Sequence, residues 1–137
     1  MKQIKLPFAF LILLVGMVTL SCSKKDIYIH LTDTKWEVVK IKKDGESAYT
    51  KTDESYLLIF TNENTFTINL DVNNCFGSYE IISSGDIEIS PLGCTEVCCD
   101  SEFAMELARL LPKMTSYYGQ GDELILEGVG KIILKEK

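Results

Sequence analysis

Five cysteines carry most of the chemistry that this 137-residue sequence could perform. Cys22 stands alone near the N-terminus, whereas Cys75, Cys94, Cys98 and Cys99 lie close together in the sequence further along the chain. A thiol can accept a lipid, form a disulfide or, as a thiolate, bind a soft metal ion. The residues around each cysteine decide among these uses.

Cys22 directly follows a segment that is typical of a lipoprotein export signal. Lys2 and Lys5 supply a basic start, an uncharged apolar run spans residues 8–20, and the small Ser21 precedes the cysteine. A membrane-spanning helix needs about 20 apolar residues, and this run is shorter. We therefore expect a lipid on Cys22, with an ordinary cleaved signal or an uncleaved anchor as the alternatives.

The lipid would attach the mature protein to a membrane. Each buried methylene contributes roughly 0.8 kcal/mol, so that one acyl chain binds marginally and two or more bind firmly. Ser23 stands where an aspartate would signal retention, which favours the outer membrane, with the domain facing the periplasm or the outside. The chain then divides into a signal peptide at 1–21, a lipidated N-terminus and tether at 22–31, and one domain at 32–137.

Charge excludes one class of partner. Removing Lys2 and Lys5 from the 14 basic residues leaves 12 against 20 acidic residues, which gives the mature chain a net charge of −8. Such a surface has no electrostatic reason to bind nucleic acid. The expected partner is the membrane, through the lipid; neither a protein partner nor a small ligand can be identified from the residues.

The residues of common catalytic sites are missing or badly placed. The single histidine, His30, lies in the tether, so the domain has no Ser-His-Asp or Cys-His arrangement. The carboxylate pairs at 53–54 and 122–123 fall in loop-like segments, and residues 128–130 form a turn rather than a phosphate-binding loop. The sequence predicts a non-catalytic domain without a cofactor or metal.

The periodicity of the domain predicts mostly β structure. In 65–72 the alternation is strict, and Phe66, Ile68, Leu70 and Val72 share one face, as in a half-buried antiparallel strand. The other strands are expected at 34–41, 56–60, near 79–81, 87–89, 114–118, 123–127 and 131–135.

The first of these strands is expected to be regular. It would place Trp36 and Val38 on one face and Val39 and Ile41 on the other.

A single helix is predicted before the last three strands. Asp100 or Ser101 can cap its first amides, and Pro112 ends or kinks it. Its apolar stripe consists of Phe103, Leu107, Leu110 and Leu111.

Aromatic side chains should form the centre of the domain. We expect Trp36, Phe66, Tyr79 and Phe103 in the core. The alternative is that they line a cavity, because small barrels can hold one apolar ligand.

Four motifs in this order resemble the META domain of HslJ-type envelope lipoproteins. They are Leu31-Thr-Asp-Thr-Lys-Trp36, Cys75-Phe-Gly-Ser-Tyr79, Thr95-Glu-Val-Cys-Cys99 and Gly121-Asp-Glu-Leu-Ile-Leu126, and together they span about 31–135. The asparagine that the family has after its first cysteine is absent, and Cys94 and Cys98 are additional. The resemblance implies an antiparallel, open or partly closed β-barrel with one packed helix, which agrees with the count of about eight strands.

The resemblance also implies a function in the cell envelope, in stress tolerance, which is an analogy at the level of the fold. Two other classes stay open. One is a lipocalin-like binder of a small apolar ligand. The other is a thiol-based metal or redox module built on Cys94, Cys98 and Cys99.

The four cysteines of the domain are expected to form disulfides, since an exported chain meets an oxidising compartment. A Cys98–Cys99 bridge is disfavoured because adjacent Cα atoms are only 3.8 Å apart across a trans peptide. The resemblance matches the two family cysteines to Cys75 and Cys99. It therefore implies Cys75–Cys99 with Cys94–Cys98, while Cys75–Cys98 with Cys94–Cys99 remains an alternative.

Overall fold

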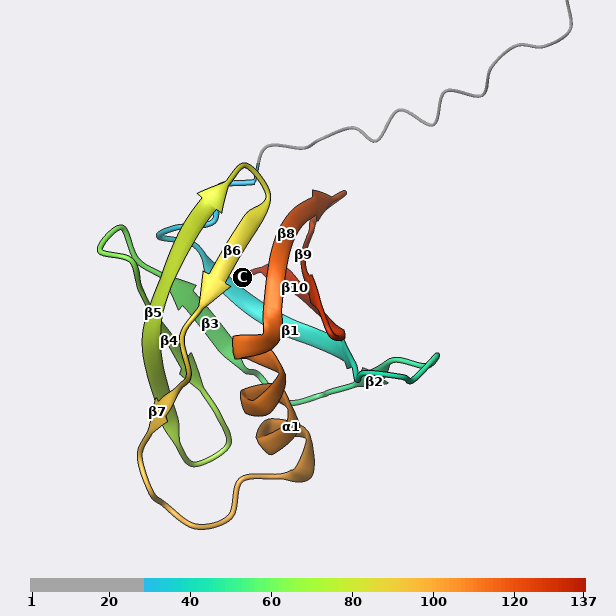
Figure 1. Ribbon diagram of the computed structural model, residues 1–137. Coiled ribbons are helices and arrows are strands. Elements are labelled where there is room, and N and C mark those ends of the chain that lie inside the picture. Colours follow the sequence, from blue (N-terminus) through green and yellow to red (C-terminus); the bar gives the residue numbers. More distant parts are fainter. Residues whose placement is uncertain (1–28) are drawn as a thin grey trace, which may run out of the picture.

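A computed structural model describes residues 29–137, so the expected signal peptide and Cys22 lie outside the described residues. The described chain is mostly strand, with one helix and a short 3-10 turn (Figure 1). The elements are β1 Lys35–Lys42, β2 Thr50–Lys51, β3 Leu57–Phe60, β4 Thr65–Asn69, β5 Asn74–Ser83, β6 Asp86–Ile89, β7 Gly93–Cys94, α1 Glu102–Leu110, η2 Leu111–Lys113, β8 Met114–Gln120, β9 Glu123–Gly128 and β10 Lys131–Glu136.

Eight of the strands form a closed antiparallel barrel. The order around it is β1, β3, β4, β5, β6, β8, β9 and β10, and β10 pairs again with β1. The closing ladder runs from Trp36 opposite Glu136 to Lys42 opposite Lys131. The predicted barrel of about eight strands with one helix is confirmed, and the sheet is fully closed. The two-residue strands β2 and β7 flank it, on β1 and β5 respectively.

The ladders of the barrel differ in length. Between β6 and β8 the register consists of the single pair Asp86 and Ser116. Beside this pair, the amide of Tyr117 donates a hydrogen bond of 2.8 Å to the carbonyl of Gly85. We call this junction the β6–β8 seam.

Inward side chains fill the barrel. Phe66 is 0% exposed, and Trp36 and Tyr79 are each 4% exposed, so these three expected core aromatics do lie in the core. The indole nitrogen of Trp36 donates to the carbonyl of Leu31 at 3.0 Å, which satisfies its one polar atom. Phe103 is half-buried at the edge of the core, where its ring stacks on that of Tyr56 with centroids 5.4 Å apart.

The expected regular alternation of the first strand is wrong. Trp36 and Val38 are buried as predicted, but Ile41 is buried with them, whereas Val39 is only half-buried. The register of β1 against β10 shifts between Val38 and Lys40, which marks a β-bulge. The extra residue reverses the faces of everything after it, and Ile41 therefore points inward.

The strand expected at 65–72 ends early. β4 stops at Asn69, and Val72 is 46% exposed rather than buried. Phe66 and Ile68 do face the core, and Leu70 is half-buried. The chain turns after Asn69 because the amide of Leu70 bonds the carbonyl of Asn73 at 2.8 Å, so the alternating pattern continues in the sequence but not in the sheet.

The predicted helix is present and packs against the core near one end of the barrel (Figure 1). The hydroxyl of Ser101 accepts a hydrogen bond of 3.2 Å from the amide of Ala104, which makes Ser101 the N-cap. Leu107 and Leu110 are buried, and Pro112 lies in the 3-10 turn that follows. No helix within residues 29–137 is long and apolar enough to cross a membrane.

Candidate functional site

The four cysteines of the domain form two disulfides, but in a different pairing from the one that the family resemblance implied. Cys75 pairs with Cys94, and Cys98 pairs with Cys99. The reason for the first bridge is register. Cys75 on β5 lies opposite Cys94 on β7, with Cα atoms 4.0 Å apart, so β7 presents Cys94 to Cys75 before the chain reaches Cys99.

The second disulfide joins adjacent residues, a pairing that the short distance between their Cα atoms led us to disfavour. Cys98 and Cys99 lie in the segment between β7 and α1, residues 95–101, which we call the disulfide loop. The backbone of Cys99 adopts a positive φ of 90°, which turns the chain at this point. Both residues are exposed, whereas Cys75 is 1% exposed.

Asn73 attaches the disulfide loop to the turn between β4 and β5. Its side-chain amide donates to the carbonyl of Val97 and to Oδ2 of Asp100, both at 2.6 Å. Its side-chain oxygen accepts from the hydroxyl of Thr95 and the amide of Val97, both at 2.8 Å. Asn73 is the one buried polar residue among those described, at 7% exposure, and all its side-chain hydrogen-bonding groups are occupied.

Two carboxylates complete this connection from opposite sides. Asp100, in the loop, accepts from the amides of Val72 at 2.9 Å and Asn73 at 3.3 Å. Asp71, in the turn, accepts from the amide of Ser101 at 2.7 Å and from the hydroxyl of Tyr56 at 2.7 Å. Turn and loop therefore hold each other by reciprocal hydrogen bonds.

Hydrogen bonds lower the pKa of both carboxylates. Burial alone would raise the pKa of Asp71, but the hydrogen bonds from Ser101 and Tyr56 outweigh it and lower that pKa below its ordinary value of 3.8. Burial acts in the same way on Asp100, and the hydrogen bonds from Val72 and Asn73 likewise lower its pKa below 3.8. Both groups are therefore carboxylates at neutral pH.

This arrangement holds an exposed disulfide on a fixed loop. Because both cysteine residues are exposed, thiol–disulfide exchange with an external thiolate is the chemistry that the loop can perform. Within residues 29–137, no three histidine, cysteine or acidic side chains converge as a metal ion would require.

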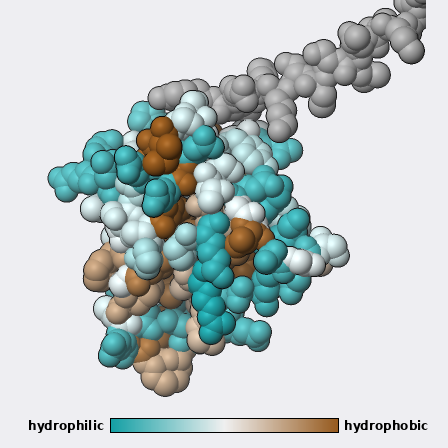
Figure 2. Space-filling view, viewed as in Figure 1, coloured by the Kyte–Doolittle hydropathy of each residue, from teal (hydrophilic) through white to brown (hydrophobic). Residues whose placement is uncertain are grey.

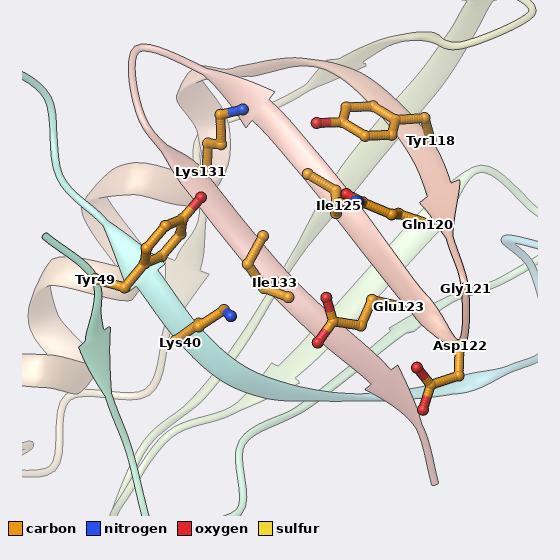
Figure 3. A pocket seen from close by; sticks show the side chains of 10 residues that line it. All are labelled: Lys40, Tyr49, Tyr118, Gln120, Gly121, Asp122, Glu123, Ile125, Lys131 and Ile133. Atoms are coloured by element: carbon orange, nitrogen blue, oxygen red, sulfur yellow. The ribbon is translucent and has the colours of Figure 1, made fainter. Parts of the chain in front are cut away.

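A second feature is a groove on the outer wall of the barrel, of about 420 Å³ (Figure 3). Ile125 and Ile133, from β9 and β10, lie along its base, and Tyr49 and Tyr118 stand on either side. Lys40 also borders it, with its ammonium 5.1 Å from the centre of the Tyr49 ring. The groove is outside the barrel, whose interior is filled by side chains, and a lipocalin-like cavity is therefore not favoured.

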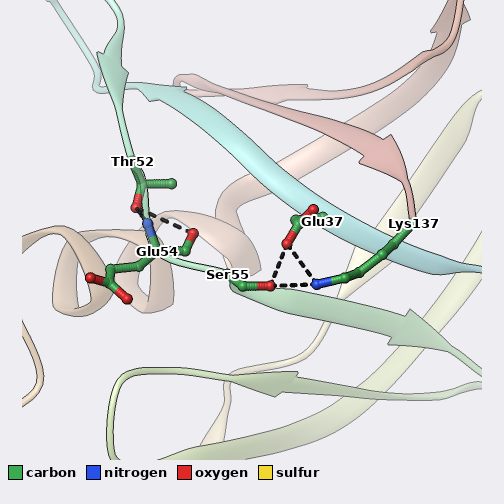
Figure 4. Close-up of polar contacts among 5 residues, drawn as sticks. All are labelled: Glu37, Thr52, Glu54, Ser55 and Lys137. Atoms are coloured by element: carbon green, nitrogen blue, oxygen red, sulfur yellow. Dashed lines mark hydrogen bonds and ion pairs between the residues drawn. The ribbon is translucent and has the colours of Figure 1, made fainter.

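A polar cluster ties the C-terminus to the barrel (Figure 4). The ammonium of Lys137 lies 3.0 Å from Oε1 of Glu37 and 2.9 Å from the hydroxyl of Ser55, which also donates to Glu37. The hydrogen bond from Ser55, and to a smaller extent the one from Lys137, lower the pKa of Glu37. These exposed contacts attach the end of the chain to β1, and we assign them a structural role.

Small size, a closed antiparallel barrel, one capped helix and a cross-linked loop before that helix define a class of compact β-barrel domains. Within this class the chain belongs to the META domain family, which matches residues 29–136. No curated protein is significantly similar to the chain.

Two solved structures resemble the fold. A protein from Burkholderia xenovorans, solved by NMR, has a TM-score of 0.62 at 17% identity, over 78% of this chain and 83% of that chain. A crystal structure of a DUF4847 family protein from Bacteroides vulgatus has a TM-score of 0.57 at 12% identity, over 77% of this chain and 94% of that chain. At these identities the likeness shows the fold alone.

The candidate site includes residues that the sequence analysis missed. The sequence does not single out Asn73, and it does not indicate that Asp71 and Asp100 bond between the turn and the loop. A faint signal exists for Asn73, because a buried asparagine is uncommon and needs partners.

Tyr118 is exposed on the groove while Tyr117 packs against the core, which is the alternation expected for a strand.

Proposed function

We propose that the protein is a non-catalytic META domain held on the cell-envelope membrane by a lipid on Cys22. The disulfides carry this proposal. Cys75, Cys94, Cys98 and Cys99 pair with one another, and Cys22 is thus left for another use. Disulfides also persist in the oxidising compartments that an exported protein enters, so their presence agrees with export.

The location of the domain in the chain supports the same proposal. Leu31 is buried in the core, and only eight residues, 23–30, lie between it and Cys22 in the sequence. We propose the outer membrane, because Ser23 follows the cysteine, and a role in envelope stress tolerance by analogy with the family.

Replacing the cysteine tests the anchor. Cys22→Ala should keep the domain folded but release it from the membrane fraction or block its processing, because no thiol remains to take the lipid. Ser23→Ala is the matched control and should stay membrane-bound. If the Cys22→Ala protein still sediments with membranes at unchanged mobility, the apolar run is an uncleaved anchor and the proposal fails.

Thiol exchange at the disulfide loop is a second candidate function. The exposure of Cys98 and Cys99 favours it, since an external dithiol can reach one of their sulfurs. The dithiol would lose two electrons and two protons and become a disulfide, and Cys98 and Cys99 would become thiols. Graded dithiothreitol followed by alkylation and mass spectrometry should label Cys98 and Cys99 before Cys75. Simultaneous labelling of all four cysteines would contradict this function.

A further inference from the structure

Two isoleucines lie exposed next to each other at the end of β5. Ile81 is 41% exposed and Ile82 is 59% exposed. The register of β5 against β6 shifts between Ile81 and Ser83, which indicates a β-bulge at the end of this hairpin. Figure 2 shows hydrophobic surface at the upper end of the molecule, over the end of β5 in the view of Figure 1.

This hairpin and the start of the described chain share one end of the barrel. The amide of Asp33 donates to the carbonyl of Phe60 at 2.8 Å, next to Thr61. The hydroxyl of Tyr79 donates to the carbonyl of Thr61 at 2.7 Å. Ile81 is two residues further along β5 than Tyr79, toward the hairpin tip, and Figure 1 shows that tip at the end where the described chain begins.

The length of the tether limits which end of the barrel can stay near a lipid on Cys22. Six residues, 23–28, lie between Cys22 and Ile29, and the seven Cα–Cα steps from one to the other span at most about 25 Å. The ten-residue β5 extends about 33 Å from the Cys75 end to the hairpin. The tether therefore keeps the end of the barrel that carries the hairpin within about 25 Å of the lipid, whereas the disulfide loop lies at the far end of β5.

Charge selects the type of lipid surface. Residues 80–88 contain Glu80, Asp86 and Glu88 but no lysine or arginine. Anionic headgroups would repel such a hairpin, whereas a zwitterionic surface leaves the apolar contribution of the isoleucines unopposed.

We propose that the tip of the β5–β6 hairpin inserts Ile81 and Ile82 into the surface of a zwitterionic bilayer and so fixes the orientation of the barrel. This inference rests on the proposed lipid anchor at Cys22. The lipid supplies attachment, and the hairpin supplies a second contact at the same end. The disulfide loop then points away from the membrane.

Tryptophan fluorescence tests the contact in the full-length lipidated protein. Trp36 is the one native tryptophan and is buried, so wild type gives the background. Ile82→Trp adds a probe at the hairpin. Val129→Trp is the matched control, because Val129 is also exposed, at 47%, but lies in the β9–β10 hairpin. Ile29 shares a surface hollow with Asp122, which lies at the opposite end of β9 from Val129. The control probe is therefore at the end of the barrel away from the tether.

Both variants are reconstituted in phosphatidylcholine vesicles that contain lipid brominated near the top of the acyl chains. The added fluorescence of Ile82→Trp should fall by about half or more, since interfacial side chains lie roughly 5–10 Å into this region. The added fluorescence of Val129→Trp should not change. Vesicles of phosphatidylglycerol with the same brominated lipid should quench Ile82→Trp less than the phosphatidylcholine vesicles do.

Vesicle flotation separates this inference from the anchor. A protein that floats but shows no quenching of Ile82→Trp overturns the hairpin contact and leaves the lipid anchor intact, and it would assign the isoleucines to a protein partner instead. Equal quenching at Ile82→Trp and Val129→Trp also overturns it. A protein that does not float overturns both proposals.

Discussion

A single buried amide, that of Asn73, joins two segments that are more than twenty residues apart in the sequence. Its side chain forms hydrogen bonds with Thr95, Val97 and Asp100, and no other described residue outside the disulfide loop makes as many hydrogen bonds with it. The position of Cys98 and Cys99 thus depends on a residue that is not a cysteine.

Asn73→Ala should therefore destabilise the domain by about 3 kcal/mol, because it removes the side-chain hydrogen bonds to Oδ2 of Asp100 and to the amide and carbonyl of Val97. The midpoint of urea unfolding measures this. Asn74→Ala is the control, since the side chain of Asn74 makes only an exposed hydrogen bond with Asn69, and it should cost well under 1 kcal/mol. Equal losses in the two variants would contradict the role of Asn73.

The two carboxylates of the connection predict how stability depends on pH. Their folded-state pKa values lie below the ordinary 3.8, so the unfolded chain binds protons more readily than the folded one at acid pH. Their contribution is complete above pH 3.8 and is lost as the pH falls through the lowered folded-state pKa. Unfolding free energy, measured from pH about 6 to about 2.5, should fall more steeply for wild type than for Asp100→Asn, which cannot titrate.

At the scale of elements, the β9–β10 hairpin depends on close backbone packing. A Cβ at Gly130 would lie 2.2 Å from the carbonyl oxygen of Lys42, and one at Gly128 would lie 2.0 Å from that of Lys113. The hairpin therefore fits against β1 and the 3-10 turn only because both side chains are absent.

Gly130→Ala should accordingly cost about 3 kcal/mol, because the backbone of β1 or β10 must move to admit the methyl group. Gly45→Ala is the comparison: the site is open, and the positive φ of 73° alone should cost about 1 kcal/mol. Thermal unfolding of the two variants measures the difference. If they are equally stable, the packing of the hairpin is looser than the distances indicate.

The elements also show what could be predicted from the sequence. The helix and its Ser101 cap were predictable because period and cap lie within a few neighbouring residues. The bulge in β1 was not, because nothing around Val39 differs from a regular strand, and the pairing with β10 alone creates it. The disulfide pairing failed for the same reason, since it depends on β7, a two-residue strand without periodicity.

At the scale of the whole molecule, the barrel should open first at the β6–β8 seam. One register pair and the Tyr117–Gly85 hydrogen bond hold the seam, whereas β10 is paired along its length on both sides. In hydrogen exchange the amide of Tyr117 should exchange at least about tenfold faster than those of β10. Equal protection would mean that the barrel opens only by global unfolding.

The closing ladder between β1 and β10 has a consequence for the order in which the chain is made. Trp36 pairs with Glu136, so β1, the first strand of the barrel to be synthesised, cannot complete its pairing until β10, the last strand, has been made. Contacts of such long sequence separation form late and slowly. A ribosome or an export channel that still holds the last few residues holds a chain that cannot close, and the loss of β10 from the C-terminus would leave β1 and β9 as two open edges prone to pairing with other chains.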